Sequence, residues 1–278
     1  MTHSISDPSS SRQSYPVNWI SVAFFAIFHI LALLALSSFS WSAIAVTLFL
    51  HWCFGSLGIC LGYHRLLSHR SLQVPKWLEY ILAISGALAV QGGPIIWVAA
   101  HRRHHAHTED NELDPYSAGR GFWWSHMGWL FYKREQVFNY QVYRKYAPDL
   151  DRQVFYRWLN RCHLLLQIPL AILLYCLGGW SFVIYGIFVR TVLLWHCTWL
   201  INSATHIRGD RRFESADNSR NLWWAAIISY GEGWHNNHHA YPKVAKAGWK
   251  WWEIDSTWWV IRILQLLGLT RKVVLPPA

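Results

Sequence analysis

Long stretches without charged side chains alternate with hydrophilic stretches along this chain of 278 residues. Residues 13–64 contain no Lys, Arg, Asp or Glu, and residues 162–207 contain one charged residue, Arg190. An apolar run of about 20 residues crosses a bilayer as a helix, because lipid offers the backbone no other easy hydrogen-bonding partner. Each stretch is long enough for two crossings with a tight turn between them. The pattern predicts four membrane spans in two hairpins, over residues 19–39, 41–61, 163–177 and 182–201.

A third apolar stretch, residues 80–100, is also long enough to cross, but Gln-Gly-Gly-Pro interrupts it at positions 91–94. Glycine next to proline is a strong signal for a helix break. If His64 and His101 belong to one site, an odd number of crossings cannot separate them. We therefore expect this stretch to lie on the membrane, to dip into it, or to pack beneath the hydrophilic part of the protein.

With four spans, both chain ends and the two large hydrophilic segments fall on one side of the membrane. All of the 25 Lys and Arg residues except Arg190 then lie on that side, which the positive-inside rule identifies as cytoplasmic. The expected organisation is a disordered polar tail followed by a single all-α membrane domain with a cytoplasmic helical cap. The tail comprises residues 1–16, the domain residues 17–278, and the cap residues 64–161 and 206–278.

The composition agrees with a membrane protein that has a hydrophilic side. Charged residues make up 14% of the chain, against about 25% in an average soluble domain. The formal net charge of +10 attracts anionic lipid headgroups and equally an acidic electron carrier. The five cysteines include no Cys-x-x-Cys pair, so we interpret them as small buried residues in a reducing compartment.

Histidines dominate the candidate chemistry. The sequence His-x-x-His-His occurs twice, at 101–105 and at 235–239, and on a helix the three rings of each copy share a face. His64 and His69 follow the second predicted span with a spacing of five, so their rings converge only if the helix ends or bends between them. Asn202 and His206 are one helical turn apart at the end of the fourth span.

All four elements lie at the hydrophilic end of a span or on the hydrophilic side, which predicts one shared site. Nine imidazoles are too many for one ion, since a structural zinc site closes at about four ligands. They suit two ions with four or five ligands each, and imidazole suits Fe, Zn, Cu or Ni. A ligand set without carboxylates keeps its cationic charge, which favours redox metals. Metal storage or a zinc site is the simpler alternative.

Four segments together resemble the membrane fatty acyl desaturases of the delta-9 type, which include stearoyl-CoA and acyl-lipid desaturases. They are "GYHRLLSHRS", "HRRHHAHTEDNELDPYSAGRGFWWSHMGW", "INSATH" and "GEGWHNNHHAYP". The resemblance implies that the metal ligands are His64, His69, His101, His104, His105, His206, His235, His238 and His239, with Asn202 reaching a metal through water. No catalytic residue beyond these ligands is expected.

The resemblance also implies two iron ions (Fe²⁺), O₂ and the insertion of a cis double bond into a saturated chain of an acyl-lipid or acyl-CoA substrate. The sequence contains no His-Pro-Gly-Gly segment, which is typical of a fused haem donor domain, so we expect electrons from a separate donor. A chain of this length resembles the bacterial or plastid acyl-lipid branch, which makes ferredoxin the expected donor. Membrane lipids are expected partners, and nucleic acids are not.

Further residues are candidates for the substrate path and for hydrogen bonds to the ligands. Trp52, Ser56 and Cys60 form an i, i+4 stripe that leads from His64 into the membrane. We hypothesise that Trp52 ends an acyl tunnel and limits chain length, although an ordinary packing role fits it as well. The expected hydrogen-bond partners of ligand rings are Glu232 (three residues before His235), His126, and the carboxylates of the 109–114 loop. These are Glu109, Asp110, Glu112 and Asp114, of which Asp110 and Asp114 are favoured, and they could equally form a solvated loop.

Two other functions stay open. Another di-iron membrane oxidase, such as an alkane or carotenoid hydroxylase or ketolase, has related histidine motifs with other spacings and produces an alcohol or a ketone instead of an alkene. A metal-binding or transport protein would place its ligands at mid-depth within the spans, whereas these ligands cluster at the membrane edge.

Overall fold

The structure is a computed structural model that describes residues 15–134 and 139–277. Within these ranges the chain is helical, and its β-structure is limited to isolated bridges, which confirms the expected all-α class. The predicted tail lies almost entirely outside the described residues. The principal helices are α1 (Trp19–Leu33), α2 (Trp41–Trp52), η2 (Cys53–Ser68), α3 (Lys76–Leu88), α4 (Pro94–Ala106), α5 (Phe122–His126), α7 (Tyr140–Tyr146), α8 (Pro148–Asp151), α9 (Val154–Cys162), α10 (Gln167–Val183), η6 (Ile184–Val189), α11 (Arg190–Ser203), α12 (Trp223–Ile228), α13 (His235–Ala240) and α14 (Ser256–Leu266). Short 3₁₀ turns complete the described elements: η1 (Leu34–Ser37), η3 (Ala118–Arg120), η4 (Gly128–Phe131), η5 (His163–Leu166) and η7 (Ala204–His206).

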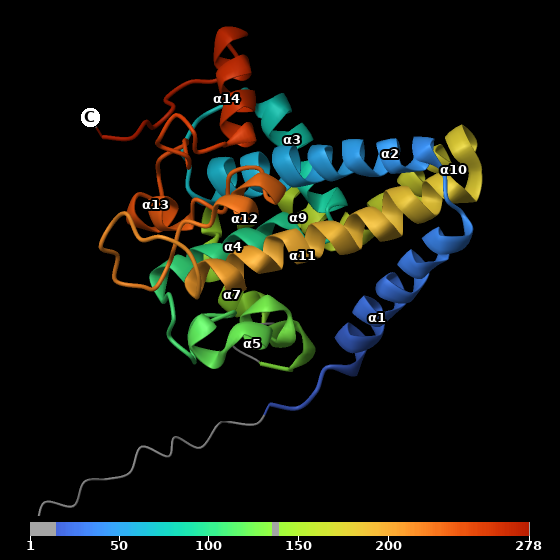
Figure 1. Ribbon diagram of the computed structural model, residues 1–278, viewed down its shortest axis with the longest axis horizontal. Helices are drawn as coiled ribbons and strands as arrows, with labels where there is room; N and C mark the ends of the chain where they lie inside the picture. Colours follow the sequence, from blue (N-terminus) through green and yellow to red (C-terminus); the bar gives the residue numbers. More distant parts are fainter. Residues whose placement is uncertain (1–14, 135–138, 278) are drawn as a thin grey trace, which may run out of the picture.

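Among the described residues, three helical runs are long and apolar enough to cross a membrane: Trp19–Ser37, Trp41–Ser68 and Val154–His206. The third run has 53 residues, far more than the roughly 20 that one crossing needs. It breaks at Gly178 and Gly179, whose backbone angles are not helical, and Gly179 has a φ of +65° that favours glycine. Beyond the break the two halves pack together through Leu174 and Val183, and α11 lies beside α2 (Figure 1).

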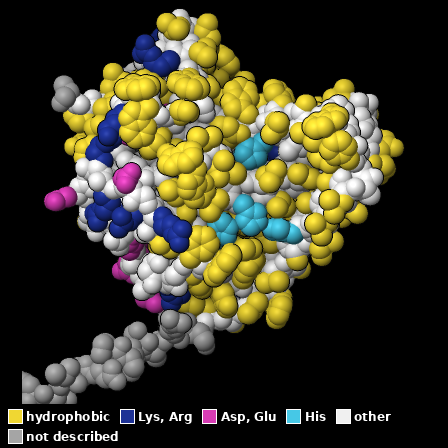
Figure 2. Space-filling model, viewed as in Figure 1, with side chains coloured by type: hydrophobic (Ala, Val, Ile, Leu, Met, Phe, Trp, Pro, Cys, Tyr) yellow, Lys and Arg dark blue, Asp and Glu magenta, His cyan; other side chains and the backbone are white. Residues whose placement is uncertain are grey.

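The runs extend further toward the hydrophilic side than the predicted spans. The second continues from position 61 to Ser68, and the third begins at Val154 instead of position 163. Figure 2 shows apolar side chains covering the part of this face where the long helices lie, and charged side chains gathering on the opposite part, over the cap. The long helices therefore carry site residues directly, without intervening loops.

The stretch at 80–100 is broken, as predicted. Helix α3 ends at Leu88, Val90 and Gly92 have positive φ angles, and Pro94 starts α4. The fully buried guanidinium of Arg190 donates a hydrogen bond of 2.8 Å to the carbonyl oxygen of Leu88. This bond and one of 3.3 Å from the side-chain amide of Gln167 satisfy a carbonyl at the end of α3, which gives the single charged residue between positions 162 and 207 a structural role.

Helix η2 is wound as a π-helix through all 16 of its residues and packs closely against α3. A Cβ atom built on Gly58 would lie 2.6 Å from the backbone nitrogen of Gly86 in α3, so only glycine permits this approach. π-Helices are rare and often occur at functional sites. This one carries the first histidine of the site on its last turn.

Candidate metal centre

The nine predicted ligand histidines converge into two groups. The ligand atoms within each group all lie within 4.8 Å of one another. The five-histidine group consists of His64, His69, His101, His105 and His238, and the four-histidine group of His104, His206, His235 and His239. Each group takes side chains from α4 and α13, and these two helices therefore hold the two groups side by side.

The geometry of the ring nitrogens fits metal ions. The Nε2 atoms of His64 and His238 are 3.1 Å apart, and those of His105 and His238 are 3.0 Å apart. In the other group, the Nε2 atoms of His206 and His235 are 3.1 Å apart. Imidazole nitrogens bind metals at about 2.0–2.1 Å, which puts neighbouring ligands of one ion about 3 Å apart. The Nε2 of His239 is buried without a hydrogen-bond partner, as a metal ligand would be.

The π-helix explains how His64 and His69 meet at a spacing of five. The backbone N–H of His69 donates to the carbonyl oxygen of His64 at 3.1 Å, and the two ring centroids lie 4.8 Å apart. A bend or a helix end was expected between these residues. The helix does end between them, at Ser68, as expected, and the wider winding of η2 also puts positions i and i+5 on nearly the same face.

Four carboxylates bind the Nδ1 atoms of ligand histidines. The pairs are His64 with Glu232 (2.7 Å), His104 with Asp114 (2.9 Å), His206 with Glu109 (3.2 Å) and His239 with Asp217 (2.6 Å). A carboxylate at Nδ1 fixes the tautomer and makes Nε2 a better metal ligand. The expectation of an uncompensated cationic site therefore needs correction, because four negative charges lie one bond outside the ligands.

The predicted hydrogen-bond partners are partly right. Glu232 does bind a ligand ring, but the ring is that of His64 and not of His235. Of the two aspartates proposed to bind a ligand ring, the fully buried Asp114 does so, at His104. Asp110 is exposed and accepts backbone N–H groups of its own loop.

His126 is also placed differently from the prediction. Its ring contacts Ser203 at 3.1 Å and His196 at 3.0 Å, away from the nine ligands. Asp217 was missed by the sequence reasoning because it lies in the loop before α12, with no spacing relation to a histidine.

Burial sets the protonation state of the ligands. It lowers the pKa of His69, His101, His105, His235 and His238 well below the usual value of 6.5, and the neighbouring imidazoles lower it further. These rings are therefore neutral at pH 7, which is the form that binds a metal.

A buried ion-pair network supports Glu232. Burial alone raises the pKa of Glu232, but its neighbours His64 and Arg65, which both hydrogen-bond to it, hold it at about 2. The guanidinium of Arg65 lies between two carboxylates, 2.9 Å from Glu232 and 2.9 Å from Asp255. A buried charge needs such pairing. The network fixes the ring of His64 from the side opposite the metal site.

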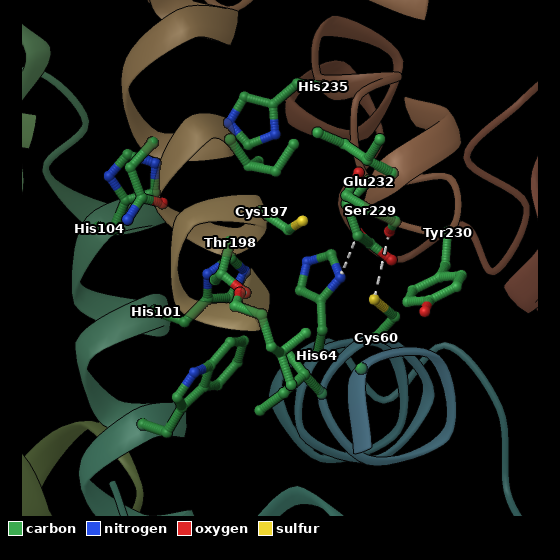
Figure 3. A pocket seen from close by; sticks show the side chains of 17 residues that line it. Cys60, His64, His101, His104, Cys197, Thr198, Ser229, Tyr230, Glu232 and His235 are labelled. Carbon is green, nitrogen blue, oxygen red and sulfur yellow. Dashed lines mark hydrogen bonds and ion pairs between the residues drawn. The ribbon is translucent and has the colours of Figure 1, made fainter. Parts of the chain in front are cut away.

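Two apolar cavities meet beside the histidines. The first, narrow cavity touches His64, His101, His104 and His235 and reaches Gly55 and Tyr230 (Figure 3). The second, of about 420 Å³, extends to Ile20 on α1 and Leu164 on η5. The two cavities share the lining residues Trp97, His101, Thr198 and Asn202.

The predicted stripe on the second span is wrong at two of its three positions. Cys60 lines the first cavity, but Trp52 and Ser56 do not. Trp52 is 37% exposed on the surface, and Ser56 is buried against Thr257. The stripe assumed α-helical spacing, whereas the cavity-lining residues Gly55, Ile59, Cys60 and His64 follow the wider π-helical turn.

A surface groove of about 780 Å³ reaches the site from the hydrophilic side. Its lining includes His105 of the five-histidine group and His239 of the four-histidine group. The groove also includes Asp217, the partner of His239. Both groups therefore lie next to a surface that another molecule can reach.

The fold and the site define a class of protein, namely a helical protein with membrane-length apolar runs and a histidine-rich metal centre beside an apolar cavity. The sequence profile described as "Fatty acid desaturase" matches residues 39–266. The chain therefore belongs to the fatty acid desaturase family, as its motifs predicted.

Several relatives support this assignment. Over 94% of its length the chain is 66% identical to the sn-2 palmitoyl-lipid 9-desaturase of Nostoc sp. (strain 36), of which it covers 92%. It is 49% identical over 92% of its length to the sn-1 stearoyl-lipid 9-desaturase of Anabaena variabilis, of which it covers 94%. It is 48% identical over 89% of its length to Delta-9 acyl-lipid desaturase 2 of Arabidopsis thaliana, of which it covers 80%.

Proposed function

We propose that this protein is an O₂-dependent acyl-lipid 9-desaturase. It inserts a cis double bond into a saturated acyl chain of a membrane glycerolipid, with two ferrous ions held by the nine histidines. The observation that carries this proposal is that both histidine groups border an apolar cavity. The three relatives described above are named for acyl lipids, which favours a glycerolipid over an acyl-CoA substrate.

The two joined cavities form the acyl channel in this proposal. The methyl end of the substrate lies in the first cavity, and the chain leaves through the second cavity toward the lipid at α1 and η5. At the junction, the indole N–H of Trp97 donates to Gln91 at 3.3 Å, and the amide of Gln91 donates to Thr198 at 2.9 Å. These bonds fix the walls at the point where the reacting carbons must be positioned.

Bound iron and O₂ supply the oxidising power, which no protein side chain has. Two hydrogens leave adjacent methylene carbons, and together with two electrons and two protons they reduce O₂ to two water molecules. The chain's own residues position the substrate and exclude bulk water through the apolar lining. Asn202 lines both cavities and holds a water molecule that completes the ligand set.

We further propose four membrane crossings, with the break at Gly178 and Gly179 as the turn between the third and fourth crossings. The histidine site then lies on the cytoplasmic side, at the edge of a bacterial or plastid-type membrane. A separate electron donor, expected to be a ferredoxin, docks over the surface groove that reaches His105 and His239. The basic net charge favours an acidic donor.

Expression in a host that makes no unsaturated fatty acids tests the proposal. We expect monounsaturated glycerolipids with the double bond at carbon 9, formed only in the presence of O₂, and no product from the variant His105→Ala. An alcohol product would identify a hydroxylase instead. Bound metal without any O₂-dependent product would identify a metal-binding protein.

A further inference from the structure

The carboxylates that contact ligand histidines are divided unequally between the two groups. Three of the four ligands in the four-histidine group have one: His104, His206 and His239. Among the described residues, the five-histidine group has a single such ligand, His64. The two groups therefore differ in their surroundings as well as in their number of ligands.

The compensation of these negative charges is unequal too. Glu232, the carboxylate beside His64, shares its charge with Arg65 at 2.9 Å. Asp114 instead takes its other hydrogen bonds from the backbone N–H groups of Glu109 and Tyr116, which are neutral.

The remaining two carboxylates also have neutral donors. Glu109 accepts the backbone N–H and side-chain amide of Asn218. Asp217 accepts the hydroxyl of Ser215 and the backbone N–H of Ser219. Among the described residues, the hydrogen bonds that these three carboxylates accept, apart from those of the histidines, come from neutral donors.

Two physical effects act in the same direction. A carboxylate at Nδ1 increases the electron donation of the imidazole to its metal. In addition, a nearby negative charge in a buried site stabilises the more highly charged state of the ion, because the local dielectric constant is low. Both effects favour the ferric over the ferrous state, and both are stronger in the four-histidine group.

We infer that the two metal sites are unequal and that Asp114, Glu109 and Asp217 are positioning residues for one of them. The four-histidine site is the one that loses its electron first when the diferrous protein is oxidised. Glu232 acts on the other site. The inference rests on the proposed di-iron function, but it concerns residues that are not themselves ligands.

The test uses the purified full-length protein loaded anaerobically with ⁵⁷Fe²⁺, studied by Mössbauer spectroscopy and by competition with a chelator. We expect three variants to lower the affinity for one iron, the same iron in each case: Asp217→Asn, Asp114→Asn and Glu109→Gln. The expected loss of affinity is about 10- to 100-fold, which is usual when a ligand histidine loses such a partner. Glu232→Gln is expected to weaken the other iron. The matched control is Asp110→Asn, since the exposed carboxylate of Asp110 accepts the backbone N–H groups of Glu112 and Leu113 in its own loop, and it is expected to leave the binding of both irons unchanged.

Oxidation by one equivalent of ferricyanide, which accepts one electron per molecule, then identifies the site that is oxidised first. The doublet that changes in Asp217→Asn belongs to the iron of the four-histidine site. We expect this ferrous doublet to be the one that the ferric signal replaces in the wild-type protein. Replacement of the doublet that Glu232→Gln alters would overturn the inference, and so would equal weakening of both irons by Asp217→Asn. A wild-type protein that binds fewer than two irons would instead contradict the proposed function.

Discussion

Tyr230 lines the first cavity, where we place the methyl end of the acyl chain, and its removal should change the chain length that the enzyme accepts. The phenol oxygen lies 2.5 Å from Nδ1 of His51, which ties the ring to α2. A Cβ atom built on Gly55 would lie 2.7 Å from the ring, so the ring fills the space beside the π-helix. In the proposed channel, the methyl end of the acyl chain meets this ring.

The magnitude follows from the substrates. Palmitoyl and stearoyl chains differ by two methylenes, and burying one methylene is worth about 0.8 kcal/mol. If Tyr230 excludes the two extra methylenes, Tyr230→Ala makes about 1.6 kcal/mol of burial available. The preference for stearoyl over palmitoyl chains should then rise by up to about 15-fold, since 1.4 kcal/mol corresponds to a factor of ten.

The assay supplies both fatty acids to a host without its own desaturase and measures the monounsaturated C16 and C18 chains by gas chromatography. Tyr230→Phe keeps the ring and should keep the wild-type ratio. Trp52→Ala is the second control, because Trp52 lies outside the cavity. A ratio within about twofold of wild type in an iron-replete Tyr230→Ala protein would refute the reasoning, as would an equal shift in Trp52→Ala.

Three further predictions concern the support of the site. Arg65→Met leaves Glu232 and Asp255 buried without their cation and should cost about 3–5 kcal/mol of stability; a loss below about 1 kcal/mol in thermal unfolding would contradict the network. Burial raises the pKa of Asp149, but hydrogen bonds from two arginines lower it to about 2, below the ordinary value of 3.8. The pairing therefore stabilises the fold above pH 4, and this stabilisation is lost as the pH falls toward 2. Asp149→Asn should lower the free energy of unfolding by about 1 kcal/mol at pH 7. A stability difference from wild type that persists at pH 2 would be inconsistent with this reasoning. A Cβ atom at Gly233 would lie only 2.1 Å from a backbone nitrogen of α12, so Gly233→Ala should displace α13 and release iron, and full iron content in this variant would show that α13 tolerates the change.

Six of the nine grouped histidines could be predicted from the sequence because helical spacing is a local property; the other three were expected from the family resemblance. His-x-x-His-His puts three rings on one face wherever it occurs in a helix, and both copies in this chain do so. The charge-free stretches likewise predicted the long helices, since lipid imposes a minimum length on a spanning segment.

The remaining features depend on contacts between segments that are distant in the sequence. The π-helical winding of η2 accompanies its close packing against α3, and no local sequence signal in η2 predicts this winding. Asp217 meets His239 across 22 residues and Glu109 meets His206 across 97, so spacing rules give no signal for either pair. The assumed α-helical stripe failed for the same reason, because its period belonged to a different helix type.

The central claim is that imidazoles from distant segments hold two irons beside an acyl channel. Iron analysis combined with iron K-edge X-ray absorption on the purified protein tests it most directly. The account predicts two irons per chain, one for each histidine group, with nitrogen or oxygen as nearest neighbours and the outer scattering pattern of imidazole. Fewer than two irons per chain, or sulfur among the nearest neighbours, would contradict it.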